Sequence, residues 1–148
     1  MIYNKDHPIQ TILIPTLAPL PADASITDKF SYYRREKSRD RRLARRIDTC
    51  GRTAMDVAAL REALGAREAA LSHIGVQISG AILQLPSVNA QLALELRYLE
   101  CLTVSETAAE MRYSCSGIQK LIYRSLCQLR ITSAPNHPKE INQEVSDL

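Results

Sequence analysis

The sequence predicts an all-α protein in which a long antiparallel helical hairpin precedes a C-terminal helix-turn-helix. Apolar residues recur at three- and four-residue steps over most of the chain, which is the period of an amphipathic helix. Ser and Thr residues stand where these periodic segments begin, and such side chains cap helix N-termini. Near the C-terminus, two helix starts are separated by one short turn, a layout typical of a helix-turn-helix.

Residues 1–25 are expected to form a flexible arm. Four prolines prevent a continuous helix there, namely Pro8, Pro15, Pro19 and Pro21. The alternative is an arm whose residues 12–14 pack on a partner subunit. Its apolar run is too short to cross a bilayer, no other segment is long enough, and the pattern of a signal peptide is missing. We therefore expect no membrane association.

The hairpin is predicted over residues 26–85, and its first helix is basic. Ser25 or Thr27 can begin this helix, which runs to Asp48. Residues 29–52 hold ten of the nineteen basic residues and only three acids. This imbalance favours an acidic partner such as the phosphates of nucleic acid. The candidate phosphate-contact residues are Arg34, Arg35, Lys37, Arg41, Arg42, Arg45 and Arg46. The alternative is a solvated face that pairs with acids of a neighbouring helix.

The second helix of the hairpin is predicted from about Thr53 to Gln84, after a break at Gly51. Its apolar residues form a heptad seam interrupted by Arg67 at one core position. The seam residues are Val57, Leu60, Leu64, Leu71, Ile74, Ile78 and Leu85. The seam can pack against the basic helix, or it can join two copies of the chain as a homodimer. The sequence leaves both open.

A helix-turn-helix domain is predicted over residues 86–130. Ser87 follows Pro86 and can cap a first helix. Thr103 and Glu106 have the spacing of a capping box, which begins a short second helix. Ser114 can cap a third helix that continues to Arg130. Residues 131–148, with two further prolines, are expected to form a flexible tail.

The apolar positions of this domain agree with three packed helices. Ala108 is small enough to let two helix backbones approach where they cross. The predicted inner-face residues are Leu92, Leu94, Leu96 and Leu99 in the first helix, Thr107, Ala108 and Met111 in the second, and Ile118, Leu121, Ile122, Leu126 and Leu129 in the third.

The segment LRYLECLTVSETAAEMRYSCSGIQKLIYRSLCQL resembles region 4 of bacterial sigma factors. It is closer still to a family of small phage and prophage proteins that join a helical N-terminal part to such a module. Some members, such as the ArpU-like proteins, are regarded as regulators of phage late transcription. The resemblance covers about the last two thirds of the chain. The matching residues are Leu96, Arg97, Tyr98, Leu102, Thr103, Glu106, Ala108, Met111, Tyr113, Ser114, Ile118, Leu126 and Leu129.

The chain departs from the family pattern at three positions. Cys101 and Arg112 stand where the family usually has Gly, and Thr107 replaces a larger apolar residue. The turn at Arg112 commonly requires a positive φ, which costs a residue with a Cβ about 1 kcal/mol. These changes affect sequence-specific binding more than they affect the fold.

The resemblance implies a DNA-binding transcription regulator whose third helix enters the major groove. Ser114 would cap this helix, and Arg112 would reach a phosphate from the turn. The residues expected to face the groove are Ser116, Gln119, Lys120, Tyr123 and Arg124. Double-stranded DNA is the expected partner, with RNA polymerase a further one. The alternative is an interaction module that binds RNA polymerase or another regulator through the hairpin, without sequence-specific DNA binding.

Other functional classes lack their sequence signals. The four cysteines form no CxxC pair, which favours reduced thiols in the cytoplasm of a bacterial host cell. His7, His73 and His137 are scattered, so no metal site is expected. No glycine-rich phosphate loop or nucleophile elbow is present. We therefore expect no cofactor and no enzymatic activity.

Overall fold

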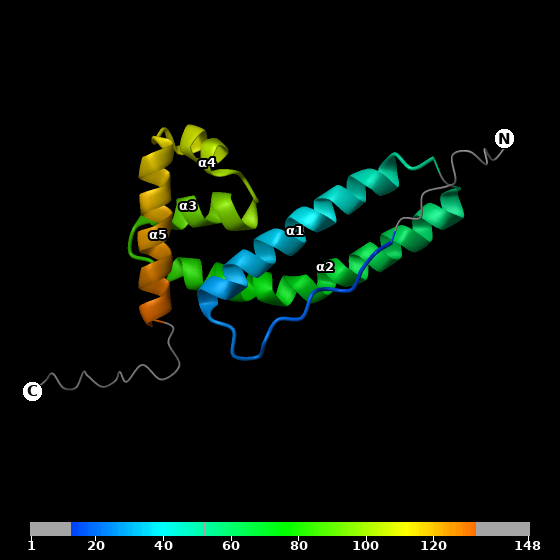
Figure 1. The fold of residues 1–148 in the computed structure, drawn as a ribbon, viewed down its shortest axis with the longest axis horizontal. Coiled ribbons are helices and arrows are strands. Elements are labelled where there is room, and N and C mark those ends of the chain that lie inside the picture. Colours follow the sequence, from blue (N-terminus) through cyan, green and yellow to red (C-terminus); the bar gives the residue numbers. More distant parts are fainter. Residues whose placement is uncertain (1–12, 52, 133–148) are drawn as a thin grey trace, which may run out of the picture.

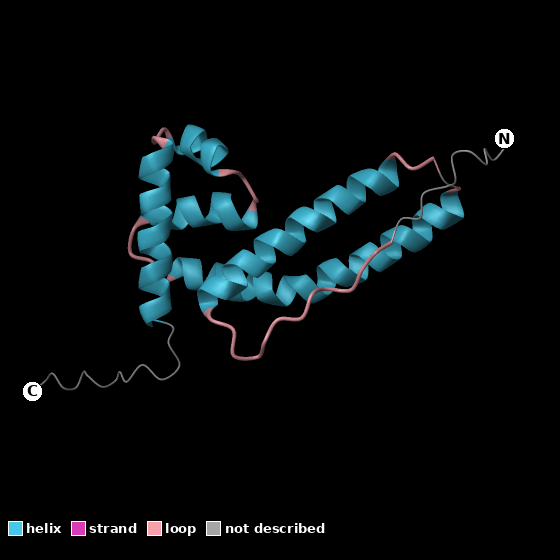
Figure 2. Ribbon diagram, in the orientation of Figure 1, coloured by secondary structure: helices cyan, strands magenta, loops and turns pink. Residues whose placement is uncertain are grey.

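The computed structural model describes residues 13–51 and 53–132, and every regular element in these two ranges is a helix (Figure 2). The predicted all-α fold class is thereby confirmed. The elements are α1 (Ile26–Asp48), α2 (Ala54–Leu83), α3 (Val88–Leu94), the π-helix η1 (Glu95–Leu99), α4 (Val104–Met111) and α5 (Cys115–Thr132). No helix within the described ranges is long and apolar enough to span a membrane.

The helix starts follow the capping residues in the sequence. Ser25 accepts a hydrogen bond from the Asp28 backbone, and the Asp28 side chain accepts one from the Ser25 backbone, which completes a capping box at α1. Thr103 and Glu106 form the same reciprocal pair at α4. Thr53 caps α2 with its hydroxyl. These local hydrogen bonds satisfy backbone donors that a helix cannot satisfy itself.

Helices α1 and α2 lie side by side and run antiparallel, and together they make the long arm of the molecule (Figure 1). Leu64, Leu71 and Ile78 of the heptad seam are buried against α1. Gly75 permits a close approach, because a Cβ there would lie 2.9 Å from the Tyr33 ring. The seam therefore packs within the chain and is not free to join a second copy.

Arg67, which interrupts the seam, is buried by an ionic cluster instead of by apolar contacts. Its Nε donates to Asp40 Oδ1 at 2.6 Å and its Nη2 to Glu36 Oε1 at 2.7 Å. Both acids come from α1 and are no more than 1% exposed. These hydrogen bonds outweigh desolvation and raise the pKa of Arg67. Arg35 and Arg39 also lie within ion-pair distance of Glu36, at 3.6 and 3.9 Å, so Arg67 is the one buried cation among three that surround the two acids.

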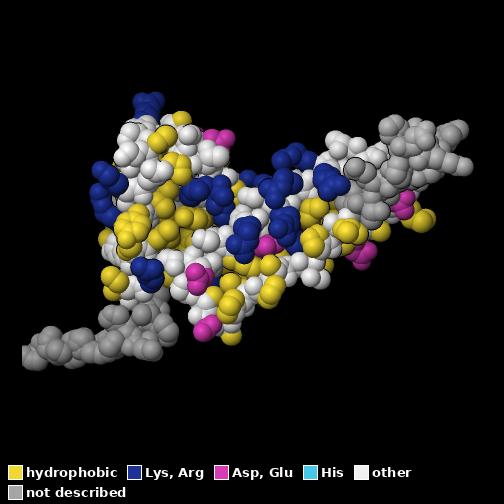
Figure 3. All heavy atoms as spheres, viewed as in Figure 1, with side chains coloured by type: hydrophobic (Ala, Val, Ile, Leu, Met, Phe, Trp, Pro, Cys, Tyr) yellow, Lys and Arg dark blue, Asp and Glu magenta, His cyan; other side chains and the backbone are white. Residues whose placement is uncertain are grey.

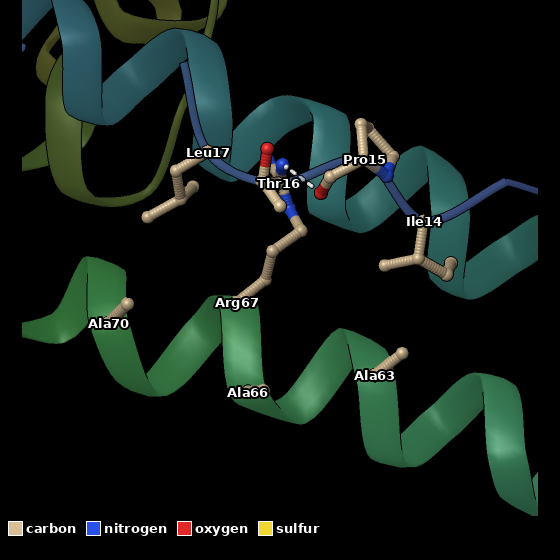
Figure 4. A pocket seen from close by; sticks show the side chains of 8 residues that line it. All are labelled: Ile14, Pro15, Thr16, Leu17, Ala63, Ala66, Arg67 and Ala70. Carbon is tan, nitrogen blue, oxygen red and sulfur yellow. Dashed lines mark hydrogen bonds between the residues drawn. The ribbon is translucent and has the colours of Figure 1, made fainter. Parts of the chain in front are cut away.

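Residues 13–24, part of the predicted flexible arm, pack on the helix pair as an extended segment, which we call the strap. Arg67 Nη1 donates to the Pro15 carbonyl at 3.0 Å, the hydrogen bond drawn in Figure 4. The Tyr32 hydroxyl donates to the Ala18 carbonyl at 2.6 Å. Residues 13–24 therefore lie against the helices, in the segment for which the sequence predicts a flexible arm. Residues 1–12 lie outside the described part of the chain, as do 133–148 of the predicted tail.

Helices α3, α4 and α5 form a second unit beside the end of the helix pair at which α1 begins and α2 ends (Figure 1). Its core contains Leu94, Ala108 and Ile118, each no more than 3% exposed. The predicted inner position of Leu92 is wrong, because this side chain is 38% exposed. Its neighbour Ala93 is buried in its place, so the inward face of α3 is rotated from the predicted one.

The connection from α3 to α4 contains two features of unusual backbone geometry. The chain widens into the π-helix η1, where the Glu100 amide donates to the Glu95 carbonyl. Tyr98 of this turn packs edge-on against Phe30 of α1, with 5.2 Å between ring centroids. Cys101 follows with a positive φ of 63°. Together these features turn the chain toward α4 while keeping Tyr98 buried against α1.

Candidate nucleic-acid interface

The turn between α4 and α5 has the left-handed residue that the sequence suggested. Arg112 has φ 61° and ψ 43° and ends α4, while its side chain is exposed. The next amide, that of Tyr113, donates to the Ala108 carbonyl at 2.9 Å. The Tyr113 hydroxyl accepts from Asn89 Nδ2 at 3.1 Å, which ties the turn to α3. The turn is thus fixed by backbone and side-chain contacts on both sides.

The start of α5 is capped by Ser114. Its Oγ accepts a hydrogen bond from the Gly117 amide at 2.9 Å, and its carbonyl accepts one from the Ile118 amide. Cys115 and Ser116 are exposed in the first turn of the helix. This end of α5 therefore presents small, uncharged side chains beside free backbone amides.

Helix α5 has one buried and one exposed face. Ile118, Ile122 and Leu129 are each no more than 7% exposed and pack in the core of the α3–α5 unit. The predicted groove-facing residues all lie on the exposed side: Ser116, Gln119, Lys120, Tyr123 and Arg124. Tyr123 is the most prominent apolar side chain among them, at 69% exposure. The structure thus brings these five residues onto one accessible surface.

The charge of this surface is modestly positive. Helix α5 contains Lys120, Arg124 and Arg130 and no acidic residue. The acids closest along the chain are Glu106 and Glu110 of α4, and Glu106 is held in its capping box. A surface of this kind attracts a polyanion, and its amide and ammonium groups match acceptors on base edges.

Two predicted phosphate contacts on α1 have a structural role instead. Arg34 Nε donates to the Arg97 carbonyl at 3.2 Å, and Arg41 Nη1 donates to the Glu100 carbonyl at 2.7 Å. The π-helix and the following turn leave these carbonyls without a helical partner, and the two arginines satisfy them. Arg34 and Arg41 therefore fasten the α3–α5 unit to α1, which distinguishes them from the other candidate contacts.

Arg97 lies at the same junction and supports it from the other side. Its Nη1 donates to the Leu102 carbonyl at 2.9 Å, and its guanidinium lies 5.8 Å from the Tyr98 ring centroid. Burial, with the neighbouring charge of Arg34, lowers the pKa of Arg97. Burial also raises the pKa of the Tyr98 phenol. Compared with water, the junction therefore disfavours the charged form of Arg97 and favours the neutral form of Tyr98.

Four other predicted phosphate contacts of α1 form a positive row, with Lys37 half-buried and three exposed arginines. Lys37, Arg42, Arg45 and Arg46 have no ion pair or side-chain hydrogen bond within the described part of the chain. The acids Glu36 and Asp40 are buried toward α2, and Glu36 also lies 3.6 Å from Arg35 Nε and 3.9 Å from Arg39 Nη1. Figure 3 shows Lys and Arg side chains following α1 and further ones at the edge formed by α5. Arg35, the seventh candidate, lies over the Tyr32 ring at 5.5 Å.

One further cation of α1, next to this row, was missing from the predicted set. Arg39 lines a groove of about 300 Å³ together with Arg42 and Arg46, opposite Leu13 and Pro15 of the strap. These arginines share one side of α1 because they lie three, four and seven residues apart. The sequence showed Arg39, but only the position of the strap makes it part of a groove.

The described residues give no indication of a metal or redox centre. No group of three or more His, Cys, Asp or Glu side chains is gathered within residues 13–51 and 53–132. Cys50, Cys101, Cys115 and Cys127 are unpaired thiols. Cys115 is exposed at the start of α5, where its sulfur lies 3.7 Å from Ser105 Oγ.

Comparisons with known proteins identify no relative from which a function could be transferred. The sequence matches no protein-family model and no curated protein, and the structure matches no solved structure. The functional argument therefore rests on the α4–α5 turn, the exposed side of α5 and the cations of α1.

Proposed function

We propose that this protein is a DNA-binding transcription regulator of phage or prophage type. In this proposal α3, α4 and α5 act as a helix-turn-helix of sigma region 4 type, α5 is the recognition helix, and the helix pair is a helical hairpin that carries it. The proposal unites the sequence resemblance with the arrangement of the C-terminal unit.

The observation that carries the proposal is the division of α5 into two faces. Its apolar residues are buried, and the five groove-facing candidates are all exposed on a helix without acids. Gln119 and Lys120 carry the readout, because an amide can pair with adenine and an ammonium with guanine in the major groove. Ser116 and the amides at the helix start can contact a phosphate.

The row on α1 supports the same proposal by supplying sequence-independent affinity. Lys37, Arg42, Arg45 and Arg46 can displace counterions from the DNA backbone, whereas the buried acids do not oppose them. Arg112 projects from the turn next to α5 and can reach a phosphate at the edge of the groove. Base readout and backbone attraction thus come from different helices.

The experiment is binding of the purified chain to DNA fragments from its own genomic neighbourhood, at two salt concentrations and with random DNA as competitor. Sequence-specific regulation is expected to give one fragment whose complex survives competitor and moderate salt. A complex that disappears with salt and ignores sequence would limit the function to backbone binding. Absence of any complex would contradict the proposal.

One observation favours a second function, binding of RNA polymerase or another regulator through the helix pair. The first turn of α5, Cys115-Ser116-Gly117, contains no charged side chain, and few of the later positions are strong readers. A module of this kind would bind purified RNA polymerase in the absence of DNA. Its binding would be unchanged by Lys120→Ala, because α5 would not contribute.

A further inference from the structure

The outer side of α2 is unusually apolar for an exposed helix face. Met55, Val76 and Leu83 are 82%, 72% and 68% exposed, although all three are large hydrophobic side chains. Helix α1 covers the opposite side of α2, and the strap covers one flank at Ala63 and Ala70 (Figure 4). A helix that is apolar on both sides generally has a second packing partner.

These side chains follow a heptad of their own. Residues seven apart on α2 share one face, and the series centred on that face is Met55, Glu62, Ala69, Val76 and Leu83. Small residues fill the neighbouring positions of the same face: Ala58, Gly65, Ser72 and Gly80. All are exposed, and a Cβ at Gly65 or Gly80 would meet no atom within 4 Å. Small side chains at such positions let a second helix approach closely.

The apolar ends and the small centre of the series match when the series is reversed. Met55 and Leu83 stand equally far from Ala69 along the helix, and so do Glu62 and Val76. In an antiparallel pair centred on Ala69, Met55 of one copy therefore reaches the level of Leu83 of the other. Apolar ends that meet in this way suit a two-fold symmetric interface, whereas Glu62 comes to the level of Val76.

Two polar residues of this face, Glu62 and His73, come close to each other in the antiparallel pair centred on Ala69. Glu62 of one copy lies within one helical turn of the level of His73 in the other, and on the same side of the pair. Within the described ranges, neither side chain has an ion pair or a hydrogen bond of its own. The two-fold axis creates this carboxylate–imidazole contact twice, and no two acids face each other across it.

We propose that a second copy of this chain packs antiparallel on the outer face of α2, with the two-fold axis at Ala69. This interface is distinct from the heptad seam, which α1 occupies. The end residues Met55 and Leu83 fill the space beyond the small central side chains, and Glu62 pairs with His73 across the axis. The dimer forms without DNA, so its test is independent of the proposed regulatory function.

The test is sedimentation equilibrium of the full chain over a range of concentrations. The wild-type chain is expected to form a dimer, and Ala69→Glu to weaken it on the order of a hundredfold, because two like charges then meet at the axis. Gln77→Glu is the matched control, since it adds the same charge to an exposed position of α2 that is not part of the heptad series. Circular dichroism verifies that both variants stay helical.

A charge exchange and a cross-link fix the register. Glu62→Lys is expected to weaken the dimer, and its combination with His73→Glu to restore it. In a Cys115→Ser background, a mixture of Met55→Cys and Leu83→Cys chains is expected to form a mixed disulfide under oxidation. A parallel pair would instead cross-link Met55→Cys to itself.

The proposal is overturned if the chain stays monomeric at all concentrations. This holds also if the outer face of α2 binds RNA polymerase instead of a second copy. It is also overturned by a dimer that Ala69→Glu leaves unchanged, or by failure of the charge exchange to restore association. Self-linkage of Met55→Cys would exclude the antiparallel arrangement.

Discussion

The two parts of this molecule use positive charge in opposite ways. The helix pair is rich in arginine, yet several of these side chains are consumed by the fold: Arg67 neutralises buried acids, and Arg34 and Arg41 bind backbone carbonyls. Helix α5 of the C-terminal unit has three basic residues and no acid, and its groove-facing side is entirely exposed. The number of cations in a segment therefore does not indicate how many of them a ligand can reach.

The largest loss of stability is expected from replacing Arg67, the cation buried between α1 and α2. Arg67→Met leaves Asp40 without a counter-charge and Glu36 with only the more distant Arg35 and Arg39, and it is expected to lower the free energy of unfolding by about 3–5 kcal/mol. Urea denaturation followed by circular dichroism measures this change. The control is the triple variant Glu36→Met, Asp40→Leu, Arg67→Met, which removes all three charges and is expected to lose less. A single variant as stable as the wild type would contradict the account of the cluster.

The exposed cations of α1 are expected to control the salt dependence of DNA binding. Replacing Arg42, Arg45 and Arg46 with Gln removes three phosphate contacts and should reduce the slope of log K against log salt by about 2.7. Titrations at several salt concentrations measure the slope. In the matched pair Arg34→Gln and Arg41→Gln, the slope is expected to stay near the wild-type value while thermal stability falls. Equal slopes for the two sets would refute the division of these arginines.

The turn of the C-terminal unit offers a smaller, stabilising change. Arg112 and Cys101 both have positive φ, a conformation in which Gly avoids the Cβ penalty. Arg112→Gly is therefore expected to raise the free energy of unfolding by about 1 kcal/mol. The same variant should weaken DNA binding if the side chain contacts a phosphate. Arg112→Ala, which removes the side chain and keeps the strain, separates the two effects in denaturation and binding assays.

The junction between the two parts is expected to weaken in alkali. Burial raises the folded-state pKa of Tyr98 above the ordinary value of 10.0. The folded state therefore favours the neutral phenol, and its contribution to stability is complete below pH 10 and is lost as the pH rises through the raised pKa. Unfolding in urea at a series of pH values measures this loss. Tyr98→Phe removes the titrating group and is expected to make the decline between pH 10 and 12 shallower.

The sequence predicted what short-range chemistry determines. Capping residues such as Thr103 lie three residues from their partners, and the positive φ at Arg112 follows from the turn that surrounds it. The ionic cluster could not be predicted from the sequence, because Arg67 contacts Asp40 and Glu36 only when α1 and α2 pack together. Its one visible signal was a charged residue within an apolar seam.

The strap and the π-helix show a second limit of sequence-based prediction. The strap is held through the backbone carbonyls of Pro15 and Ala18, groups that every residue possesses and that leave no pattern in the sequence. The π-helix is accompanied by burial of Tyr98 against Phe30, a tertiary contact. For the candidate interface, the exposed residues of α5 followed from helical spacing, whereas the hydrogen bonds of Arg34 and Arg41 to the α3–α5 unit required the packed structure.

The most direct test of the central claim compares two double variants on one DNA site. Gln119→Ala with Lys120→Ala removes the proposed base readers, and Gln77→Ala with Arg130→Ala removes the same kinds of side chain elsewhere. The first is expected to weaken binding to the specific fragment by about 2–4 kcal/mol while binding to random DNA changes little, and the second to leave discrimination intact. Equal loss on specific and random DNA, or no difference between the two variants, would contradict recognition through α5.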